Sequence, residues 1–427
     1  MIRDSDSACP FRLTIRESHD YPLAPLAAAL ALCFTVTTHA ASITVNDPSS
    51  GRITGHCTLL DAVTSVNTQA VAPGSSCVAG DGVNDTINFS SGFTITFTAA
   101  TSGVDALVLT KPVTIDGGVL AGGAPRVIIE RNGTQSVRLI DATANLTLNG
   151  VTLRNGLASF GDGGGIIATG ANVTMTNSIV SGNTASNHGG GVSVYHGALM
   201  LTNSTVSGNT ATTFNGGGIH VEGGSVTSIN STISGNTAGQ KAGGIYTNAT
   251  ATLTNTTVSG NTAAGSGGGL FAHDIVLNFS TFSGNSVPSG HVGGGIAVAS
   301  GATPTATATA TLMFGNGPGS DVDSTAPVTL NGDHNLIGTI GTNITLANPT
   351  LACDPLLKPL TNNGGPTATQ AIYPPSCALD AGPTTTTLAT DQRGLPRLFG
   401  SATDIGAFEY QGPNDPSDRI FYNGFDP

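Results

Sequence analysis

A repeat of about 26 residues in the middle of the chain constrains its fold more than any other feature. A motif close to Ser-Gly-Asn-Thr recurs in steps of 24 to 31 residues, with its asparagines at Asn155, Asn183, Asn209, Asn236, Asn261, Asn285 and Asn316. Glycine-rich runs follow the same period, at Gly163–Ile166, Gly189–Val192, Gly216–Ile219, Gly243–Ile245, Gly267–Leu270 and Gly293–Ile296. Because one such repeat cannot bury an apolar face alone, neighbouring repeats must stack into a solenoid. The spacing predicts that the seven motif asparagines lie in one line along the solenoid axis.

The repeats predict short strands. Apolar and polar residues alternate in Val192–Tyr195 and Ile219–Glu222, which is the two-residue period of a strand. The Gly, Asn, Ser and Thr residues between such stretches favour turns. A coil of this length has room for three short strands, and the crossover rule favours a right-handed turn. The predicted fold is an all-β, right-handed parallel β-helix of 24–31-residue coils, with an N-terminal helical cap and a C-terminal cap domain.

The composition agrees with an elongated solenoid. Of the 427 residues 59 are Gly, none is Trp and only 9% are charged, which is unlike a compact enzyme with a large aromatic core. The net charge of −12, without a basic cluster, gives no electrostatic footprint for nucleic acid.

The N-terminus predicts export. Residues 23–36 are almost wholly apolar but short for a membrane span, and residues 38–40 offer a small-residue cleavage site, so residues 1–40 are interpreted as a signal peptide. The leader before residue 22 is long and mixed in charge, which leaves open a true start downstream of Met1. No later apolar run is long enough for a membrane helix, so the mature chain is expected to have no transmembrane segment.

The cysteines support export. Two leave with the signal peptide, and the remaining four, Cys57, Cys77, Cys353 and Cys377, form an even set that indicates disulfides. The nearest pairing joins Cys57 to Cys77 and Cys353 to Cys377. A zinc site is not favoured, because the close Cys-x-x-Cys pairs typical of zinc ligands are missing.

The remaining segments are predicted from local patterns. Residues 41–145 form an N-terminal cap and irregular first coils, 146–330 the regular coils, 331–410 a C-terminal cap, and 411–427 a tail that is either a sorting or docking signal or an unstructured end. In the N-terminal cap, Thr58 and Asp61 stand at capping-box spacing and predict a short helix. Strands are predicted at Asp85–Phe89, Thr94–Phe97 and Pro112–Asp116.

The N-terminal cap and the regular coils each resemble a known family. The stretch Cys57 to Ala62 resembles the CSLREA segment that opens many bacterial exported β-helix proteins, and it departs from that segment at Leu60 and Asp61. The repeats are similar to the paired Gly-Gly-Ala-Ile and Phe-x-x-Asn repeats of polymorphic outer-membrane proteins, although only Phe282–Asn285 matches the second motif strictly.

The C-terminal region resembles the choice-of-anchor Q domain. The matching motifs, in order, are Asn335–Gly338, Asp354–Leu357, Asn363–Thr367, Asp380–Gly382, Asp391–Gly394 and Asp404–Glu409. In that family the domain precedes varied surface-attachment tails. The resemblance therefore implies an exported, surface-associated bacterial protein.

Catalysis on the repeats is not favoured. Polysaccharide hydrolases need two carboxylates about 5–9.5 Å apart, and calcium-dependent lyases need a carboxylate cluster. Between Val151 and Ser320, before Asp321, the chain has Asp162, Glu222 and Asp274, each two coils from the next, or about 10 Å along the axis. No catalytic residues are assigned, and a polysaccharide lyase or glycoside hydrolase is kept as the alternative function.

Acidic residues are denser near the C-terminus. They are Asp354, Asp380, Asp391, Asp404 and Glu409, with Arg393 and Arg397 among them. A calcium or active site is the alternative here, but ion pairs and Asx-turns that hold a cap together explain the pattern better. No metal site and no cofactor are expected.

Two outward columns of the repeats are the candidate binding surface. If the residue that ends each glycine run points inward, the next one points outward. The first outward column is Ile167, Ser193, His220, Tyr246, Phe271 and Ala297. The second, two residues further on, is Thr169, Tyr195, Glu222, Asn248, His273 and Ala299.

The aromatic residues in these columns predict a flat strip that stacks on sugar rings or receives a partner protein. The ligand-binding candidates are Tyr195, His220, Glu222, Tyr246, Phe271 and His273. Being outward, they are expected to contribute little to stability. The alternative is an ordinary solvated sheet face.

The sequence thus predicts an exported β-helix protein, extracellular or attached to the bacterial cell surface. It is expected to act by binding, as an adhesin-like or structural element, with a surface glycan or a protein as ligand.

Overall fold

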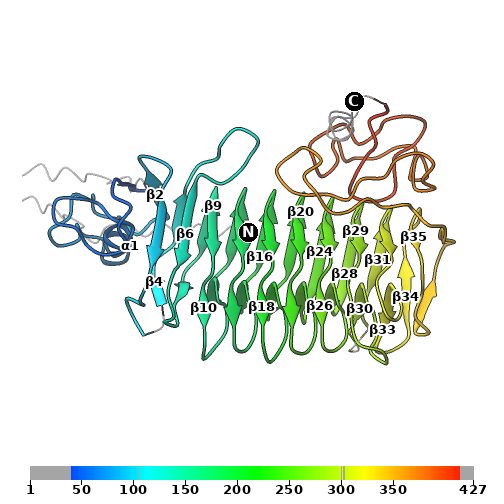
Figure 1. Cartoon of the computed structure of the whole chain (residues 1–427), viewed down its shortest axis with the longest axis horizontal. Coiled ribbons are helices and arrows are strands. Elements are labelled where there is room, and N and C mark those ends of the chain that lie inside the picture. The colour runs from blue at the N-terminus through cyan, green and yellow to red at the C-terminus, as the bar shows by residue number, and fades with distance from the viewer. Residues whose placement is uncertain (1–39, 104, 300, 302, 414–427) are drawn as a thin grey trace, which may run out of the picture. The chain divides into compact units, whose positions relative to one another are not determined.

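The computed structural model describes residues 40–413, except residues 104, 300 and 302. The predicted signal peptide (apart from Ala40) and the tail beyond residue 413 lie outside the described residues. The described chain is an all-β, right-handed parallel β-helix, as predicted. Its coils stack along one long axis (Figure 1).

Four sheets of parallel strands make up the solenoid in the described part of the chain, and neighbouring strands in each sheet come from successive coils. The twelve-strand sheet contains β1 (Ser42–Val45), β2 (Asp85–Phe89), β5 (Val113–Asp116), β8 (Leu146–Asn149), β12 (Val173–Thr176), β16 (Leu199–Thr202), β20 (Val226–Ile229), β24 (Thr250–Thr254), β28 (Asp274–Asn278), β31 (Ala306–Thr309), β34 (Val328–Asn331) and β36 (Ile344–Leu346). The ten-strand sheet contains β3 (Thr94–Phe97), β6 (Val127–Arg131), β9 (Val151–Arg154), β13 (Ile179–Ser181), β17 (Thr205–Ser207), β21 (Thr232–Ser234), β25 (Thr257–Ser259), β29 (Thr281–Ser283), β32 (Leu312–Phe314) and β35 (Leu336–Ile337).

Two smaller sheets complete the coil. The five-strand sheet contains β10 (Leu157–Ala158), β14 (Thr184–Ala185), β18 (Thr210–Ala211), β22 (Thr237–Ala238) and β26 (Thr262–Ala263). The nine-strand sheet contains β4 (Asp105–Leu109), β7 (Arg138–Ala142), β11 (Ile166–Thr169), β15 (Val192–Tyr195), β19 (Ile219–Glu222), β23 (Ile245–Thr247), β27 (Leu270–Ala272), β30 (Ile296–Val298) and β33 (Val322–Ser324). A middle coil such as β12–β13–β14–β15 therefore has a fourth, two-residue strand beyond the three predicted.

Inward side chains of successive coils stack into one apolar core. The twelve-strand sheet, for example, pairs Val173 with Leu199, Leu199 with Val226, and Val226 with Ala251. All four are at most 1% exposed. Because each coil covers the apolar face of its neighbour, none of these short strands has to be stable alone.

A ladder of buried asparagine side chains joins the coils between the ten-strand and five-strand sheets. In each step Nδ2 of one asparagine donates to Oδ1 of the next, over 2.7–2.9 Å, from Asn183 through Asn209, Asn236, Asn261 and Asn285 to Asn316. The backbone N–H of each asparagine donates to the same Oδ1, and the other Nδ2 hydrogen reaches a strand carbonyl of the preceding coil. These buried amides thus have partners for both their donors and their acceptor.

Asn155, the first of the seven motif asparagines, is not part of this ladder. Arg154 pairs with Ser181, so Asn155 aligns with Gly182 and the following Gly156 aligns with Asn183. Asn155 is exposed and adopts φ +62°, close to φ +63° of Gly182. Gly156 N–H, 27 residues before Asn183, donates to Asn183 Oδ1, so the first coil is one residue shorter than the asparagine spacing indicated. The prediction that all seven asparagines are aligned was therefore wrong for Asn155.

The ladder ends on a carboxylate. Asp321 Oδ1 accepts from both the backbone N–H and Nδ2 of Asn316, at 2.8 Å each. Its Oδ2 accepts from the backbone and side chain of Thr339. The next coil has no asparagine to continue the ladder. The Asp321 carboxylate, which only accepts hydrogen bonds, therefore supplies the acceptor that the Asn316 donors need.

Glycine is required where the chain turns from the ladder into the nine-strand sheet. Gly189 and Gly216 adopt φ +58° and +68°, a region that side chains disfavour. A Cβ on the next residue, Gly190, would lie 2.4 Å from the backbone oxygen of Gly217 in the following coil. Glycine therefore recurs here for two reasons: its first position needs a positive φ, and its second position leaves no room for a Cβ between adjacent coils.

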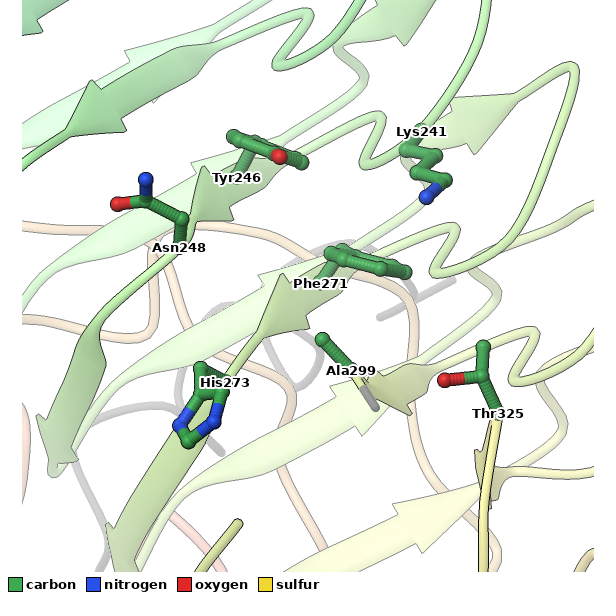
Figure 2. A pocket seen from close by; sticks show the side chains of 7 residues that line it. All are labelled: Lys241, Tyr246, Asn248, Phe271, His273, Ala299 and Thr325. Atoms are coloured by element: carbon green, nitrogen blue, oxygen red, sulfur yellow. The ribbon is translucent and has the colours of Figure 1, made fainter. Parts of the chain in front are cut away.

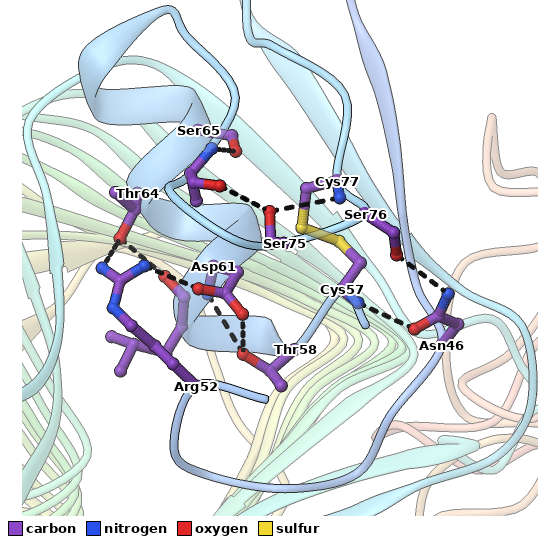
Figure 3. The surroundings of a disulfide bond; sticks show 12 residues. Asn46, Arg52, Cys57, Thr58, Asp61, Thr64, Ser65, Ser75, Ser76 and Cys77 are labelled. Carbon is purple, nitrogen blue, oxygen red and sulfur yellow. Dashed lines mark hydrogen bonds and ion pairs between the residues drawn. A yellow bond between two sulfur atoms is a disulfide. The ribbon is translucent and has the colours of Figure 1, made fainter. Parts of the chain in front are cut away.

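The N-terminal cap contains the predicted helix, α1 (Leu59–Thr68), at the first coils (Figure 1). Thr58 caps it by accepting from the Asp61 N–H and donating to Asp61 Oδ2, and Arg52 pairs with the same carboxylate at 2.6 Å (Figure 3). Both predicted disulfides are present: Cys57–Cys77 with Cα atoms 4.8 Å apart, and Cys353–Cys377 with 6.6 Å. The predicted pairing is confirmed.

The C-terminal region differs from the predicted end cap. The solenoid continues past residue 330 through β34–β36, and the chain then runs back along the outer face of the ten-strand sheet (Figure 1). Gln392 exemplifies the contact: its Nε2 donates to Thr232 Oγ1 at 2.9 Å, and its Oε1 accepts from Thr257 Oγ1 at 2.7 Å. Outward hydroxyls of successive strands thus hold this segment against the side of the β-helix.

A buried charge network organises this segment. Arg393 pairs with Asp391 at 2.8 Å, and Arg397 Nη1 lies 3.7 Å from Glu409 Oε2, with all four side chains fully buried. Arg397 Nη2 also donates to Asn255 Oδ1 of the β-helix at 2.6 Å. These contacts agree with the interpretation of the acidic residues as structural.

We expect Asn236→Ala to lower the free energy of unfolding by about 3 kcal/mol. The substitution leaves the donors of Asn209 and the carbonyl of Val206 without their partners in a buried site, at about 1–3 kcal/mol for each unsatisfied group. Denaturant unfolding measures the change. Asn155→Gly is the control and should change stability by less than about 0.5 kcal/mol; an equal loss in both variants would contradict the ladder described above.

We also expect the C-terminal segment to be held less firmly as pH rises from 5 to 8. Burial raises the pKa of Asp404 to about 6, and burial with the nearby Asp404 charge raises the pKa of Glu409 to about 8. The folded state therefore binds these protons more tightly than the unfolded chain, so the contribution of these two groups to stability is complete below their unfolded pKa of about 4 and is lost as the pH rises through their folded values. Hydrogen exchange of residues 388–410, corrected for intrinsic rates, should accelerate across this range while β16 and β20 stay unchanged. Constant protection of residues 388–410 would refute the expectation.

Candidate functional site

The outward face of the nine-strand sheet has the predicted register. The pairing of successive parallel strands aligns one column of residues: Ile167, Ser193, His220, Tyr246, Phe271 and Ala297. It also aligns Thr169, Tyr195 and Glu222 in the second column. Neighbouring side chains in each column are therefore one strand spacing apart, about 4.8 Å.

The first column is mostly covered, contrary to the expected open strip. His220 is 1% and Phe271 5% exposed, and Ser193 and Ala297 are fully buried. The loops that enter the nine-strand sheet fold over this column. From them, the His188 ring lies 4.4 Å from the His220 ring.

The rings form a continuous stack across the coils. Phe214 stacks on His188 at 5.0 Å, His220 on Tyr246 at 5.1 Å and Tyr246 on Phe271 at 5.5 Å. The Tyr246 and Phe271 planes differ by only 7°. One in-register aromatic residue per coil imposes this arrangement, because parallel strands repeat the same side-chain direction.

The stack ends in an open groove of about 370 Å³ at Tyr246 and Phe271. Figure 2 shows its lining residues: Lys241, Tyr246, Asn248, Phe271, His273, Ala299 and Thr325. The groove exists because small residues follow large ones: Phe271 pairs with Ala297 in the next coil, and Ala299 is the corresponding small residue of the second column. Its volume lies near the lower end of the usual range for small-molecule sites, about 300–1,000 Å³.

Three of the six candidate residues line this groove. Tyr246, Phe271 and His273 are brought together, whereas Tyr195, His220 and Glu222 lie on the preceding coils. The sequence analysis missed Lys241 and Thr325 as lining residues. A signal for Lys241 was available, because it is the only Lys or Arg between Arg154 and Lys358.

His273 has a fixed orientation. Its Nδ1 lies 3.0 Å from Asp274 Oδ2, and Asp274 Oδ1 accepts from the N–H and hydroxyl of Thr305. Although burial alone would raise it, these hydrogen bonds lower the pKa of Asp274 below its usual value. A charged carboxylate thus holds the imidazole in place.

Burial dominates the electrostatics of the stack. It lowers the pKa of His220 to about 3, so this ring is neutral and has the role of an aromatic packing element. It also raises the pKa of Tyr246, with a further contribution from the Glu222 charge. His220 is therefore unsuited to carry charge to a ligand.

Two carboxylates that the sequence analysis treated as unrelated share one neighbourhood. Asp162 Oδ1 accepts from the backbone N–H of His188 at 2.9 Å. Glu222 is half-exposed, with Oε2 4.0 Å from His220 Nε2. Burial raises the pKa of Tyr195, and the charges of both Asp162 and Glu222 raise it further, so both carboxylates act on the same phenol.

The described residues contain no group of three or more His, Cys, Asp or Glu side chains placed to hold a metal ion. No helix within residues 40–413 has the length and apolar character needed to cross a membrane. The open groove and the carboxylates beside Tyr195 are thus the features with functional chemistry on the nine-strand sheet.

The family-model comparison agrees with the β-helix scaffold. Residues 135–312 match a family model described as the right-handed β-helix region. A search of the solved structures found similarity to pectate lyase Pel9A, at 14% identity and a TM-score of 0.47, over 87% of this chain and 97% of that one. No curated protein sequence matches this chain.

Phe271→Ala should lower the free energy of unfolding by about 3 kcal/mol, the lower end of the range for a buried phenylalanine. The ring is 5% exposed and packs with Ala242 and Ala297, which corrects the expectation that outward residues contribute little. Chemical denaturation measures the change. Met200→Ala, at a 44% exposed position outside the core, is the control and should stay within about 0.5 kcal/mol. Similar values for both variants would contradict the burial of Phe271.

Proposed function

We propose that this chain is an exported, surface-associated binding protein that holds a glycan in the groove at Tyr246 and Phe271. The observation that carries the proposal is the stacked pair of nearly parallel rings at the margin of an open groove with polar lining residues. Sugar rings present apolar C–H faces together with hydroxyls, so they suit an aromatic surface bordered by hydrogen-bonding groups.

The polar groups of the groove fit this ligand. Asn248 Oδ1 accepts from the Gly223 N–H at 3.0 Å, which orients its amide, and His273 is held by Asp274. Figure 2 shows Asn248 and His273 on one side of the aromatic pair and Lys241 on the other. Pre-oriented polar groups reduce the entropy lost when a ligand binds.

Export is supported by the two disulfides. Disulfides of this kind persist in oxidising compartments and are rare in the cytosol. With the apolar N-terminal stretch and the choice-of-anchor-like motifs, they favour a location outside the cell or on its surface. An adhesin-like or structural role on the bacterial surface is therefore the biological setting we propose.

Cleavage of a polysaccharide is the second candidate function. Glu222 offers a half-exposed carboxylate next to the groove residues, and Asp162 affects the same Tyr195. Two carboxylates in one neighbourhood are the minimum for acid–base hydrolysis of a glycosidic bond. Binding is preferred, because both carboxylates lie outside the lining of the groove.

Tyr246→Ala should weaken glycan binding by about tenfold, as expected for the loss of one stacked aromatic contact of about 1.4 kcal/mol. A glycan array on the purified chain identifies the ligand, and calorimetry then gives the affinity of each variant. Phe160→Ala is the matched control, since Phe160 is a 90% exposed aromatic residue that does not line the groove. Equal affinity in both variants would reject the groove as the binding site. Glycan cleavage that is lost in Glu222→Gln would instead establish the second function.

A further inference from the structure

Lys241 has an unusual position in the chain and in the groove. It is the single Lys or Arg between Arg154 and Lys358, in a protein of net charge −12. Its Nζ lies 4.5 Å from the centre of the Phe271 ring, and no described carboxylate forms an ion pair with it. The positive charge at the groove is therefore not explained by a salt bridge.

The backbone at Lys241 is fixed by the neighbouring coil. Its N–H donates to Asn215 Oδ1 at 3.1 Å, and its carbonyl accepts from the Gly216 N–H at 2.9 Å. The residue is exposed, and its side chain extends over Phe271. The ammonium group is thus delivered to the groove from a well-defined backbone position.

Ala242, the residue after Lys241, also differs from its counterparts in the other coils. The other coils have glycine at the first position of the glycine run, with φ between +58° and +74°, whereas this coil has Ala242 at φ +59°. This angle is unfavourable for alanine. The buried Ala242 packs with Phe271 and Ala297, so its methyl group supports the ring at the groove. Two adjacent departures from the repeat thus shape one site.

Charge is distributed unevenly across the groove. Both oxygens of Asp274 are engaged, by His273 and by Thr305. Glu222 lies on the side of Asn248, because the Asn248 amide contacts Gly223, the next residue. Lys241 lies on the opposite side, over Phe271 (Figure 2). An anionic group on a ligand would therefore be repelled from the Asn248 side and attracted to Lys241.

Resting on the binding function proposed above, we infer that the groove is selective for an acidic saccharide. The sugar ring packs against the partly exposed Tyr246 side chain at the margin of the groove, and its carboxylate or sulfate accepts hydrogen bonds from Lys241 Nζ. Uronate and sulfate esters share the anionic oxygens that an ammonium group binds. The other side of the ring faces Asn248 and His273, which suit sugar hydroxyls.

The test measures affinities of the purified full chain by calorimetry for four hexasaccharides: a mannuronate, a sulfated glucan, a neutral glucan and a glucosamine oligomer. One or both of the anionic probes should bind at least tenfold more tightly than the neutral one, and their affinity should fall as salt rises from 50 to 500 mM. The mannuronate and sulfated probes separate the two sources of negative charge.

The variants separate charge from packing. Lys241→Met keeps an apolar chain over Phe271 and should lose the preference for the anionic probe, about tenfold, without weakening the neutral one; Lys241→Arg should keep it. Lys111→Met, at a lysine remote in sequence that does not line the groove, is the matched control and should change nothing. Circular dichroism checks that the variants fold.

Two different results would overturn the two proposals. Equal affinity for anionic and neutral probes, or tightest binding of the glucosamine oligomer, would reject the acidic ligand but leave glycan binding in place. No binding of any of the four probes, and none on the glycan array, would reject the proposed function itself.

Discussion

The ladder of buried asparagine amides is the interaction on which the coil geometry depends. Each side chain joins its own turn to the next coil and to a strand carbonyl of the preceding one, so the coil corner has the same shape in every repeat. Unsatisfied amides in this position would be costly, which requires the bonds to continue from coil to coil. Asp321 ends the series with a residue that only accepts. The glycine run then fits into the space that this fixed corner leaves.

The groove arises where the repeat is interrupted on a scaffold that is otherwise regular. Tyr246 and Phe271 continue the ring stack, and the change to Ala297 and Ala299 opens a hollow beside them. Lys241 and Ala242 replace the usual residues of the coil in the same place. A solenoid tolerates such changes because outward residues contribute little to the contacts between coils, unless a loop covers them, as it does Phe271.

The C-terminal segment is held by contacts that need two distant parts of the chain. Gln392 and Arg397 reach Thr232, Thr257 and Asn255, which are more than 130 residues earlier in the sequence. A buried arginine needs charged and polar partners, and Glu409 and Asn255 supply them from the segment itself and from the β-helix. The β-helix is therefore part of the environment that makes this segment stable.

The sequence alone determined the fold class, the period, the register of the outward columns, the capped helix and both disulfides, because each depends on local spacing. It misplaced Asn155, since one residue in a turn changes the register without changing the motif. It named Tyr246, Phe271 and His273 but missed that loops bury His220 and Phe271 and that Lys241 reaches the groove. The lateral position of the C-terminal segment was decided by tertiary structure. Loops and long side chains have no period, so their positions depend on packing between residues far apart in the chain.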